Sequence, residues 1–259
     1  MKKIKLLLCL FMLTTLCGCS NSNKNESSKT LNAAMFWIST SLDPTNNYDG
    51  WVLSRIGVGE TLLKLNEKYE VEPYLAKSYE QIDDTTWKLT LKDSITFSNG
   101  KKVTGENVKS CLERAFEKNT RAIDYFDLNH VEAKGQDIYL YLNKSSGAIL
   151  NNLCEPLFTI YDASQSEEDI ASHPICTGPF VVDDFVSEKT IDTSKNKKYY
   201  DGKAKLDHVH FSQVADSDAR VLALQSGEVD LANTIDYSSL KLFRNNKDYQ
   251  VLEVLGPRT

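Results

Sequence analysis

The sequence predicts an α/β protein whose main sheet is mostly parallel. Val209 and Phe211 alternate with histidines, and this period of two is typical of a strand. A helical segment follows at about 218–226, and Gly227 supplies the left-handed conformation that ends it. Residues 229–231 form the next strand. A strand, a helix and a strand over so few residues predict a parallel pair joined by a right-handed crossover.

The N-terminal residues are predicted to lie outside the folded body. Lysines precede an apolar run, 6–16, that is too short to span a bilayer, which takes roughly 20 residues. Residues 1–18 are therefore typical of a lipoprotein secretion signal. Leu-Cys-Gly-Cys at 16–19 resembles the lipobox of bacterial lipoproteins, which implies cleavage before Cys19 and a diacylglycerol on its thiol. The alternative is an ordinary signal-peptidase site without lipid. Residues 19–30 offer little apolar area to bury and are expected to form a disordered, lipid-anchored tether.

The charge balance argues against some partners. The chain has 30 basic and 36 acidic side chains. Residues 1–18 hold three lysines and no acid, so the remainder has 27 basic against 36 acidic side chains, a net charge of −9. Phosphate binding needs clustered Lys and Arg, so nucleic acid is not expected as a partner. A folded face that adheres to anionic lipid is not expected either.

The main domain is expected to begin with an apolar strand at 31–38. Leu42-Asp43-Pro44 ends it, because the residue before proline avoids the helical conformation and proline cannot continue a central ladder. A polar loop follows. Residues 51–63 are then predicted to form a helix rich in apolar residues and loosened by two glycines.

A second group of elements is expected from residue 64 to about 173. Trp87, Leu89 and Leu91 alternate with polar residues and predict a strand with one solvated face. Thr104 is expected to cap a helix with a single apolar stripe that starts at Val108. The other expected elements are a tight turn at 98–101, a strand at 138–142, short helices at 148–153 and 237–244, and a strand at 251–255.

Several motifs share one order along the chain. They lie at 42–44 (Leu-Asp-Pro), 72–78, 86–92, 97–100 (Phe-Ser-Asn-Gly), 177–182 (Thr-Gly-Pro-Phe-Val-Val), 197–211 and 219–231. From about residue 35 to the end, these motifs resemble the peptide/nickel-type extracellular solute-binding proteins (family 5) of ABC importers. Each motif alone is weak, and their shared order carries the resemblance.

The resemblance implies a periplasmic-binding-protein-like (type II) lobe with an inserted α/β subdomain. The main solute-binding lobe would comprise 31–63 and 174–259, and 64–173 would be the insertion. In the family a second lobe follows. The chain is therefore expected to match only the N-terminal half, with the second lobe missing. Gly178 and Pro179 are expected to fix the turn where the chain returns to the main lobe.

The resemblance implies capture of a solute, not catalysis, so no enzyme activity and no cofactor are expected. The expected partners are a small solute, either an oligopeptide or a nickel or other metal chelate, and ABC permease subunits. The body would lie outside the cytoplasm, held at the cell membrane only by the N-terminal lipid. The rival hypothesis is a truncated surface lipoprotein that binds another protein without transporting a solute.

The ligand-binding candidates are Asn47, Tyr48, Trp51, Arg121 and Glu155. In the family, residues just after the Leu-Asp-Pro motif line the cleft. The alternative for Trp51 is that it belongs to the hydrophobic core. Arg121 lies near a position that faces an anionic chelate in the nickel-type branch, and a guanidinium suits carboxylates. Its alternative is a surface arginine. Glu155 stands where that branch has a second arginine, and a carboxylate favours a cationic group such as a peptide amine. The solute stays open between peptide and metal chelate.

No metal site is expected. His208 and His210 share one face of a strand, but zinc takes three or four protein ligands and only Asp207 lies nearby, so we expect a solvated face. Three cysteines remain after the lipid acceptor. Either Cys154 pairs with Cys176, or all three thiols stay buried and unpaired.

Overall fold

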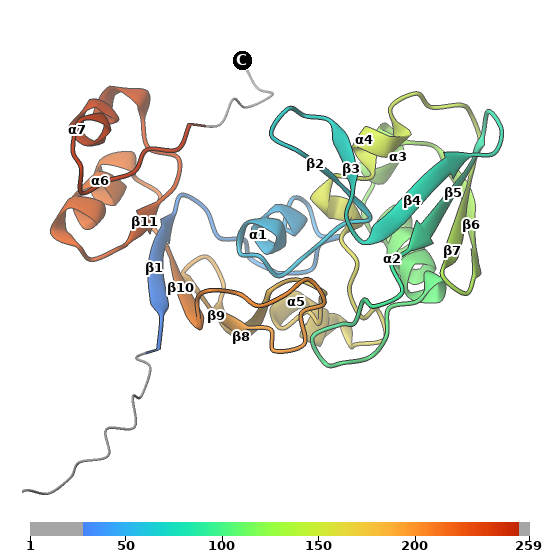
Figure 1. The fold of residues 1–259 in the computed structure, drawn as a ribbon, viewed down its shortest axis with the longest axis horizontal. Helices are drawn as coiled ribbons and strands as arrows, with labels where there is room; N and C mark the ends of the chain where they lie inside the picture. Colours follow the sequence, from blue (N-terminus) through green and yellow to red (C-terminus); the bar gives the residue numbers. More distant parts are fainter. Residues whose placement is uncertain (1–27, 254–259) are drawn as a thin grey trace, which may run out of the picture.

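The computed structural model describes residues 28–253, which fold around two larger β-sheets and a small hairpin (Figure 1). The predicted secretion signal, Cys19 and the tether up to residue 27 lie outside the described residues. Thr30, expected at the end of the tether, instead begins the first strand. Among residues 28–253, no helix has the length and apolar character that a membrane crossing needs.

The larger sheet has the N-terminal strand in its interior. β1 (Thr30–Met35) lies between β11 (Leu231–Ala232) and β10 (His208–Gln213) and runs parallel to both. β9 (Thr190–Lys195) and β8 (Phe180–Val186) continue the sheet in antiparallel pairings. The sheet is therefore mixed and not mostly parallel as predicted. β9 runs antiparallel to β8 because a short turn joins the two strands, and it runs antiparallel to β10 on its other side.

The predicted crossover is present, but the strands that it joins are not neighbours. α6 (Ser217–Ser226) leads from β10 to β11; Asp216 caps its start, and Gly227, at φ 75°, ends it. β1 enters between the two strands. Ala33 and Ala34 of β1 are 1% and 0% exposed, which is the burial of an interior strand covered on both faces.

Arg220 of α6 ties the ends of β10 and β11 together. It is 3% exposed. It donates to the backbone oxygens of Val214 and Ala215, after β10, at 2.6 and 2.9 Å. It also donates to those of Asn233 and Thr234, after β11, at 2.9 and 2.6 Å. These bonds satisfy a guanidinium that would otherwise be costly to bury.

The second large sheet is antiparallel and is covered by one long helix. Its strands are, in order across the sheet, β4 (Ala76–Gln81), β5 (Thr86–Leu91), β7 (Asp137–Leu142) and β6 (Leu128–Lys134). α2 (Gly105–Lys118) packs against β6 and β7. Thr104 caps α2 as predicted, in a reciprocal capping box with Asn107.

The remaining elements are short. They are β2 (Leu63–Leu65) and β3 (Val71–Pro73), which form the hairpin, with α1 (Gly50–Arg55), α3 (Ala122–Tyr125), α4 (Ile149–Asn152), η1 (Pro156–Phe158), α5 (Glu167–Ser172), η2 (Tyr237–Ser239) and α7 (Lys241–Arg244). The helix predicted at 51–63 is thus only six residues long. It ends early because Gly57 adopts φ 70° and the next two N–H groups bond back to Leu53. The predicted strand at 251–255 is absent over 251–253, and its last two residues lie outside the described range.

One hydrophobic core joins the two large sheets. Met35 of β1, Leu89 of β5 and Leu112 of α2 belong to the same buried cluster. The two sheets therefore share one buried core.

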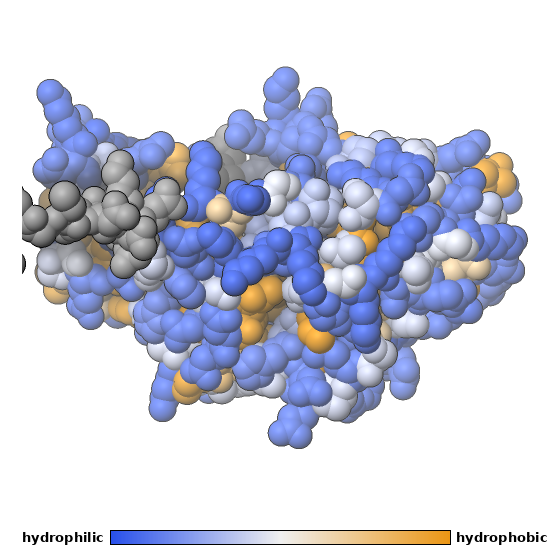
Figure 2. All heavy atoms as spheres, turned by 60° about the horizontal axis from the view of Figure 1, so that its bottom comes forward, coloured by the Kyte–Doolittle hydropathy of each residue, from blue (hydrophilic) through white to orange (hydrophobic). Residues whose placement is uncertain are grey.

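The face shown in Figure 2 is predominantly hydrophilic, and its apolar residues form separate small groups.

Candidate functional site

The loop between β1 and α1, which carries the first candidate residues, is held by an ion pair. Arg114 of α2 binds Asp43 in a bidentate manner, with Nη1 2.8 Å from Oδ1 and Nη2 2.6 Å from Oδ2. Nη1 also donates to the hydroxyl groups of Thr45, at 2.7 Å, and Tyr161, at 2.9 Å. Burial acts to raise the pKa of Asp43, but hydrogen bonds from Arg114 and Thr45 outweigh it and hold this pKa below its usual value. The Leu-Asp-Pro motif therefore anchors the loop to α2.

Arg121 reaches across to this loop. Its guanidinium carbon lies 3.7 Å from the centre of the Tyr48 ring, a cation–π contact. Its Nη1 donates to the backbone oxygen of Asn47 at 3.0 Å, and its Nη2 donates to the Tyr125 hydroxyl at 2.7 Å. Tyr48 is 48% exposed, so this contact lies at the surface of the described body. Asn47, Tyr48 and Arg121 are thus brought together, and Arg121 is held in place by its neighbours.

Glu155 and Trp51 form the adjoining part of the cluster. Glu155 lies between α4 and η1, and its Oε1 accepts a hydrogen bond from Nε1 of Trp51 at 2.9 Å. Burial raises the pKa of Tyr125 to about 12, and the nearby carboxylate of Glu155 adds to the rise. Tyr125 thus contacts Arg121 and is influenced by the charge of Glu155, which relates the two parts. We call Asn47, Tyr48, Trp51, Arg121, Tyr125 and Glu155 the loop–helix cluster.

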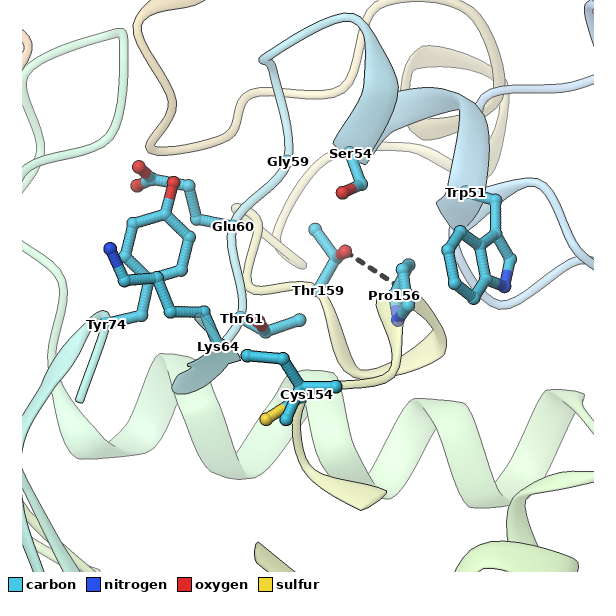
Figure 3. Close-up of a pocket in the computed structure, with 11 residues that line it drawn as sticks. Trp51, Ser54, Gly59, Glu60, Thr61, Lys64, Tyr74, Cys154, Pro156 and Thr159 are labelled. Carbon is cyan, nitrogen blue, oxygen red and sulfur yellow. Dashed lines mark hydrogen bonds between the residues drawn. The ribbon is translucent and has the colours of Figure 1, made fainter. Parts of the chain in front are cut away.

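Trp51 also borders a hollow of about 290 Å³ (Figure 3). The residue is 38% exposed, so the alternative that places it in the core is wrong. Figure 3 shows Trp51 at one end of the hollow and Glu60, Lys64 and Tyr74 at the other. An aromatic wall beside polar groups is typical of a small-molecule site.

Glu60 is a buried acid that sequence reasoning missed. It is 2% exposed, and its oxygens accept hydrogen bonds from the hydroxyls of Thr177, at 2.7 Å, and Tyr199, at 2.8 Å. Thr177 precedes the Gly-Pro pair predicted to mark the returning chain. Glu60 therefore ties that returning segment to the wall of the hollow. No local pattern reveals it, because its partners lie 117 and 139 residues away.

Asp49, next to the loop–helix cluster, is expected to make stability depend on pH. It is 3% exposed, and its Oδ2 accepts a hydrogen bond from Nδ2 of Asn46 at 2.6 Å. Burial raises its pKa to about 6; the Asn46 bond opposes the rise and the charge of Asp43 adds to it. An unfolded aspartate has a pKa of about 3.9. The folded state therefore holds this proton to higher pH, and stability falls as pH rises from about 4 to about 6.

Asp49→Asn is expected to remove this loss and to raise the free energy of unfolding by about 1–3 kcal/mol at neutral pH, with little effect near pH 4. Urea denaturation across this pH range measures the difference. Asp84→Asn, at an exposed position, is the control and should leave the pH dependence unchanged. An equal gain for Asp49→Asn at both pH extremes would contradict the assignment.

The histidines considered as metal ligands and the cysteines considered as a disulfide do not form such sites among the described residues. His208 is exposed, and Nδ1 of His210 lies 2.7 Å from Oδ1 of Asp192. Residues 28–253 contain no group of three or more His, Cys, Asp or Glu side chains arranged to hold a metal ion. Cys111, Cys154 and Cys176 are free, which rules out the Cys154–Cys176 pairing in this structure; Cys154 is only half-buried.

Known proteins resemble this chain in sequence. The model of the bacterial extracellular solute-binding proteins, family 5 Middle, matches residues 70–259. The nickel-binding protein NikA of Staphylococcus aureus is 33% identical over 244 residues, which are 94% of this chain and 48% of that protein. The glutathione-binding protein GsiB of Escherichia coli O1:K1 / APEC is 27% identical over 201 residues, 74% of this chain and 39% of that protein.

Solved structures share the fold. NikA of Staphylococcus aureus, in complex with Ni(L-His)2, has a TM-score of 0.80 at 33% identity, over 85% of this chain and 46% of that one. The nickel ABC transporter structure from Bacillus halodurans gives 0.80 at 30% identity with the same two coverages. The chain thus spans about half the length of these relatives, and the predicted α/β, periplasmic-binding-protein-like fold is confirmed. Since the family model matches residues 70–259, well over half of the chain, the protein belongs to the bacterial extracellular solute-binding proteins, family 5.

Proposed function

We propose that this chain is part of the solute-binding lipoprotein of an ABC importer, which captures a small solute and delivers it to the permease. The observation that carries the proposal is the loop–helix cluster. Its members, all but one singled out from the sequence, contact one another, and one of them, Trp51, lines a hollow of about 290 Å³. The family supports capture in place of catalysis.

The charges of the cluster suit a solute that bears both acidic and amine groups. Arg121 offers a guanidinium that favours carboxylates. Glu155 offers a carboxylate, which repels a wholly anionic chelate and attracts an amine. A short peptide carries both groups, and so does an amino acid that chelates a metal. Ni(L-His)2, which is bound to the related NikA of Staphylococcus aureus, is of the second kind.

We propose the same division of the chain that the sequence indicated. The main lobe comprises 31–63 and 174–259, and 64–173 is the insertion. In support, the five-stranded sheet takes its strands from the two outer ranges, and the antiparallel sheet lies within the insertion. In the whole protein, a second lobe closes over the solute and buries it. Export by residues 1–18 and a lipid on Cys19 would hold this body outside the cytoplasm.

Binding to the loop–helix cluster is expected to be weak, in the millimolar range, because this chain spans about half of its relatives. Titration of the chain with nickel(II)–L-histidine or dialanine, followed by nuclear magnetic resonance, should shift the Trp51 indole N–H saturably. Arg121→Ala should weaken the binding about tenfold or more, because it removes a charged hydrogen-bond donor.

Arg244→Ala is the matched control. Arg244 also lies over a tyrosine ring, 4.9 Å from the centre of Tyr237, and pairs with Glu253 at 2.8 Å, but it belongs to α7 outside the cluster. Its loss should leave the titration unchanged. Absence of any saturable shift with either probe, or equal effects of the two arginine variants, would overturn the proposed function.

A further inference from the structure

Asn119 contacts both halves of the loop–helix cluster, which come from distant parts of the sequence. Asn47 lies on the loop, and Arg121 follows α2, 74 residues later. Nδ2 of Asn119 donates to the backbone oxygens of Thr45 and Asn47, both at 3.1 Å. Its Oδ1 accepts from the backbone N–H of Arg121 at 3.0 Å. One side-chain amide therefore joins the two halves.

The end of α2 places Asn119 at this junction. Its N–H bonds to the backbone oxygen of Ala115, while φ −119° and ψ 108° take its own backbone out of the helix. The residue is 6% exposed. Both hydrogens of its amide group are used by the loop. Asn119 therefore acts on the loop and on Arg121 and offers no donor to a solute.

The loop conformation depends on being held from this side. Asn47 has φ 45°, in the left-handed region, which asparagine adopts more readily than most other non-glycine residues. Its backbone oxygen accepts from Nδ2 of Asn119 at 3.1 Å and from Nη1 of Arg121 at 3.0 Å. The next residue, Tyr48, carries the ring on which Arg121 lies. The two bonds therefore hold the peptide group that joins Asn47 to Tyr48.

We propose that Asn119 is the positioning residue of the solute site, which sets the placement of the Arg121 guanidinium on the Tyr48 ring. The effect of Asn119 on capture rests on the proposed function, because it requires that a solute binds at the cluster. The contact between Arg121 and Tyr48 exists without a solute, so the effect of Asn119 on that contact is tested separately.

Two variants and one matched control test the assignment. Asn119→Ala removes all of the side-chain bonds. Asn119→Asp keeps the size and the acceptor for Arg121 but loses both donors to the loop. Asn196→Ala is the control: Asn196 is 5% exposed, donates to the oxygen of Gly178 at 2.9 Å and accepts from the N–H of Lys198 at 2.9 Å, away from the cluster.

The first measurement needs no solute. The side-chain Hε–Nε resonance of Arg121 should be displaced by the ring current of Tyr48, because the guanidinium carbon lies 3.7 Å from the ring centre. Asn119→Ala and Asn119→Asp should each reduce this displacement by at least about half, and the Asn196 control should retain it. A displacement that both Asn119 variants keep would overturn the positioning role, since a merely structural asparagine leaves this contact intact.

The second measurement is the titration with nickel(II)–L-histidine and dialanine. Both Asn119 variants should bind about tenfold more weakly than the wild-type chain, and the control within about twofold. Binding by Asn119→Asp at the wild-type level would overturn the proposal, because the donors to the loop would then be dispensable. If the wild-type chain binds neither probe, the proposed function fails, and the resonance of Arg121 alone decides the positioning role.

Discussion

Replacing Asp43 with alanine is expected to lower the free energy of unfolding by about 3–5 kcal/mol, because it leaves the largely buried side chain of Arg114 without its bidentate partner. The Asp43 and Arg114 side chains are 13% and 14% exposed, so water replaces little of what is lost. The loop to Thr45 should also detach from α2. Urea denaturation followed by tryptophan fluorescence measures the change.

Asp93→Ala is the control for this variant. Asp93 pairs with Lys77 at 3.4 Å, but the two side chains are 77% and 46% exposed. Such a pair contributes less than about 1 kcal/mol. If Asp43→Ala cost no more than this exposed control, the ion pair would not be what anchors the loop.

Replacing Gly178 with alanine is expected to cost about 3 kcal/mol, the second-largest effect, because the segment has no room for a side chain. A Cβ at Gly178 would lie 2.5 Å from the backbone oxygens of Gly57 and Val58. The backbone is fixed from both sides, since the Gly178 N–H donates to Val58 and its oxygen accepts from Asn196. The same denaturation experiment measures the loss.

Gly147→Ala provides the comparison. A Cβ at Gly147 meets nothing within 4 Å, so this variant should change stability by less than about 0.5 kcal/mol. A Gly178 variant as stable as the Gly147 variant would show that the returning segment shifts freely. The glycine of the Thr-Gly-Pro motif would then be needed only for the turn that the sequence indicated, and not for close packing.

Local signals predicted the elements that depend on near neighbours in the sequence. The helix after Thr104 forms as expected, because its capping box needs only Asn107, three residues on. The helix that Gly227 ends also forms, and Gly227 takes the expected left-handed conformation. The strand with Trp87, Leu89 and Leu91 lies where the alternation indicated. Each of these signals is complete within a few residues.

The strand order of the main sheet was beyond such signals. The short apolar pattern at β1 predicted a strand but not its place between β10 and β11. That place depends on pairing Thr30 with His208, far along the chain, and on packing that only the folded body provides. The helix predicted at 51–63 ends early for a local reason, because Gly57 turns the chain and the next two N–H groups bond back to Leu53.

The candidate site was predictable in its members but not in its contacts. Resemblance to the family indicated Tyr48, Arg121 and Glu155, and the structure places them in one cluster. The sequence could not predict whether Trp51 lies in the core or at the site, because its partner Glu155 lies 104 residues away. Asn119 belongs to no motif, and a buried polar residue at the end of a helix gives no sign of the loop that it will meet. Its importance emerges only from long-range hydrogen bonds.

Arg220 has a mechanical consequence. Its guanidinium bonds to the chain just past β10 and again at Asn233 and Thr234, directly before residues 235–253. The ends of the interior strand β10 and of the edge strand β11 are therefore held at a fixed spacing by one side chain, although β1 separates the two strands.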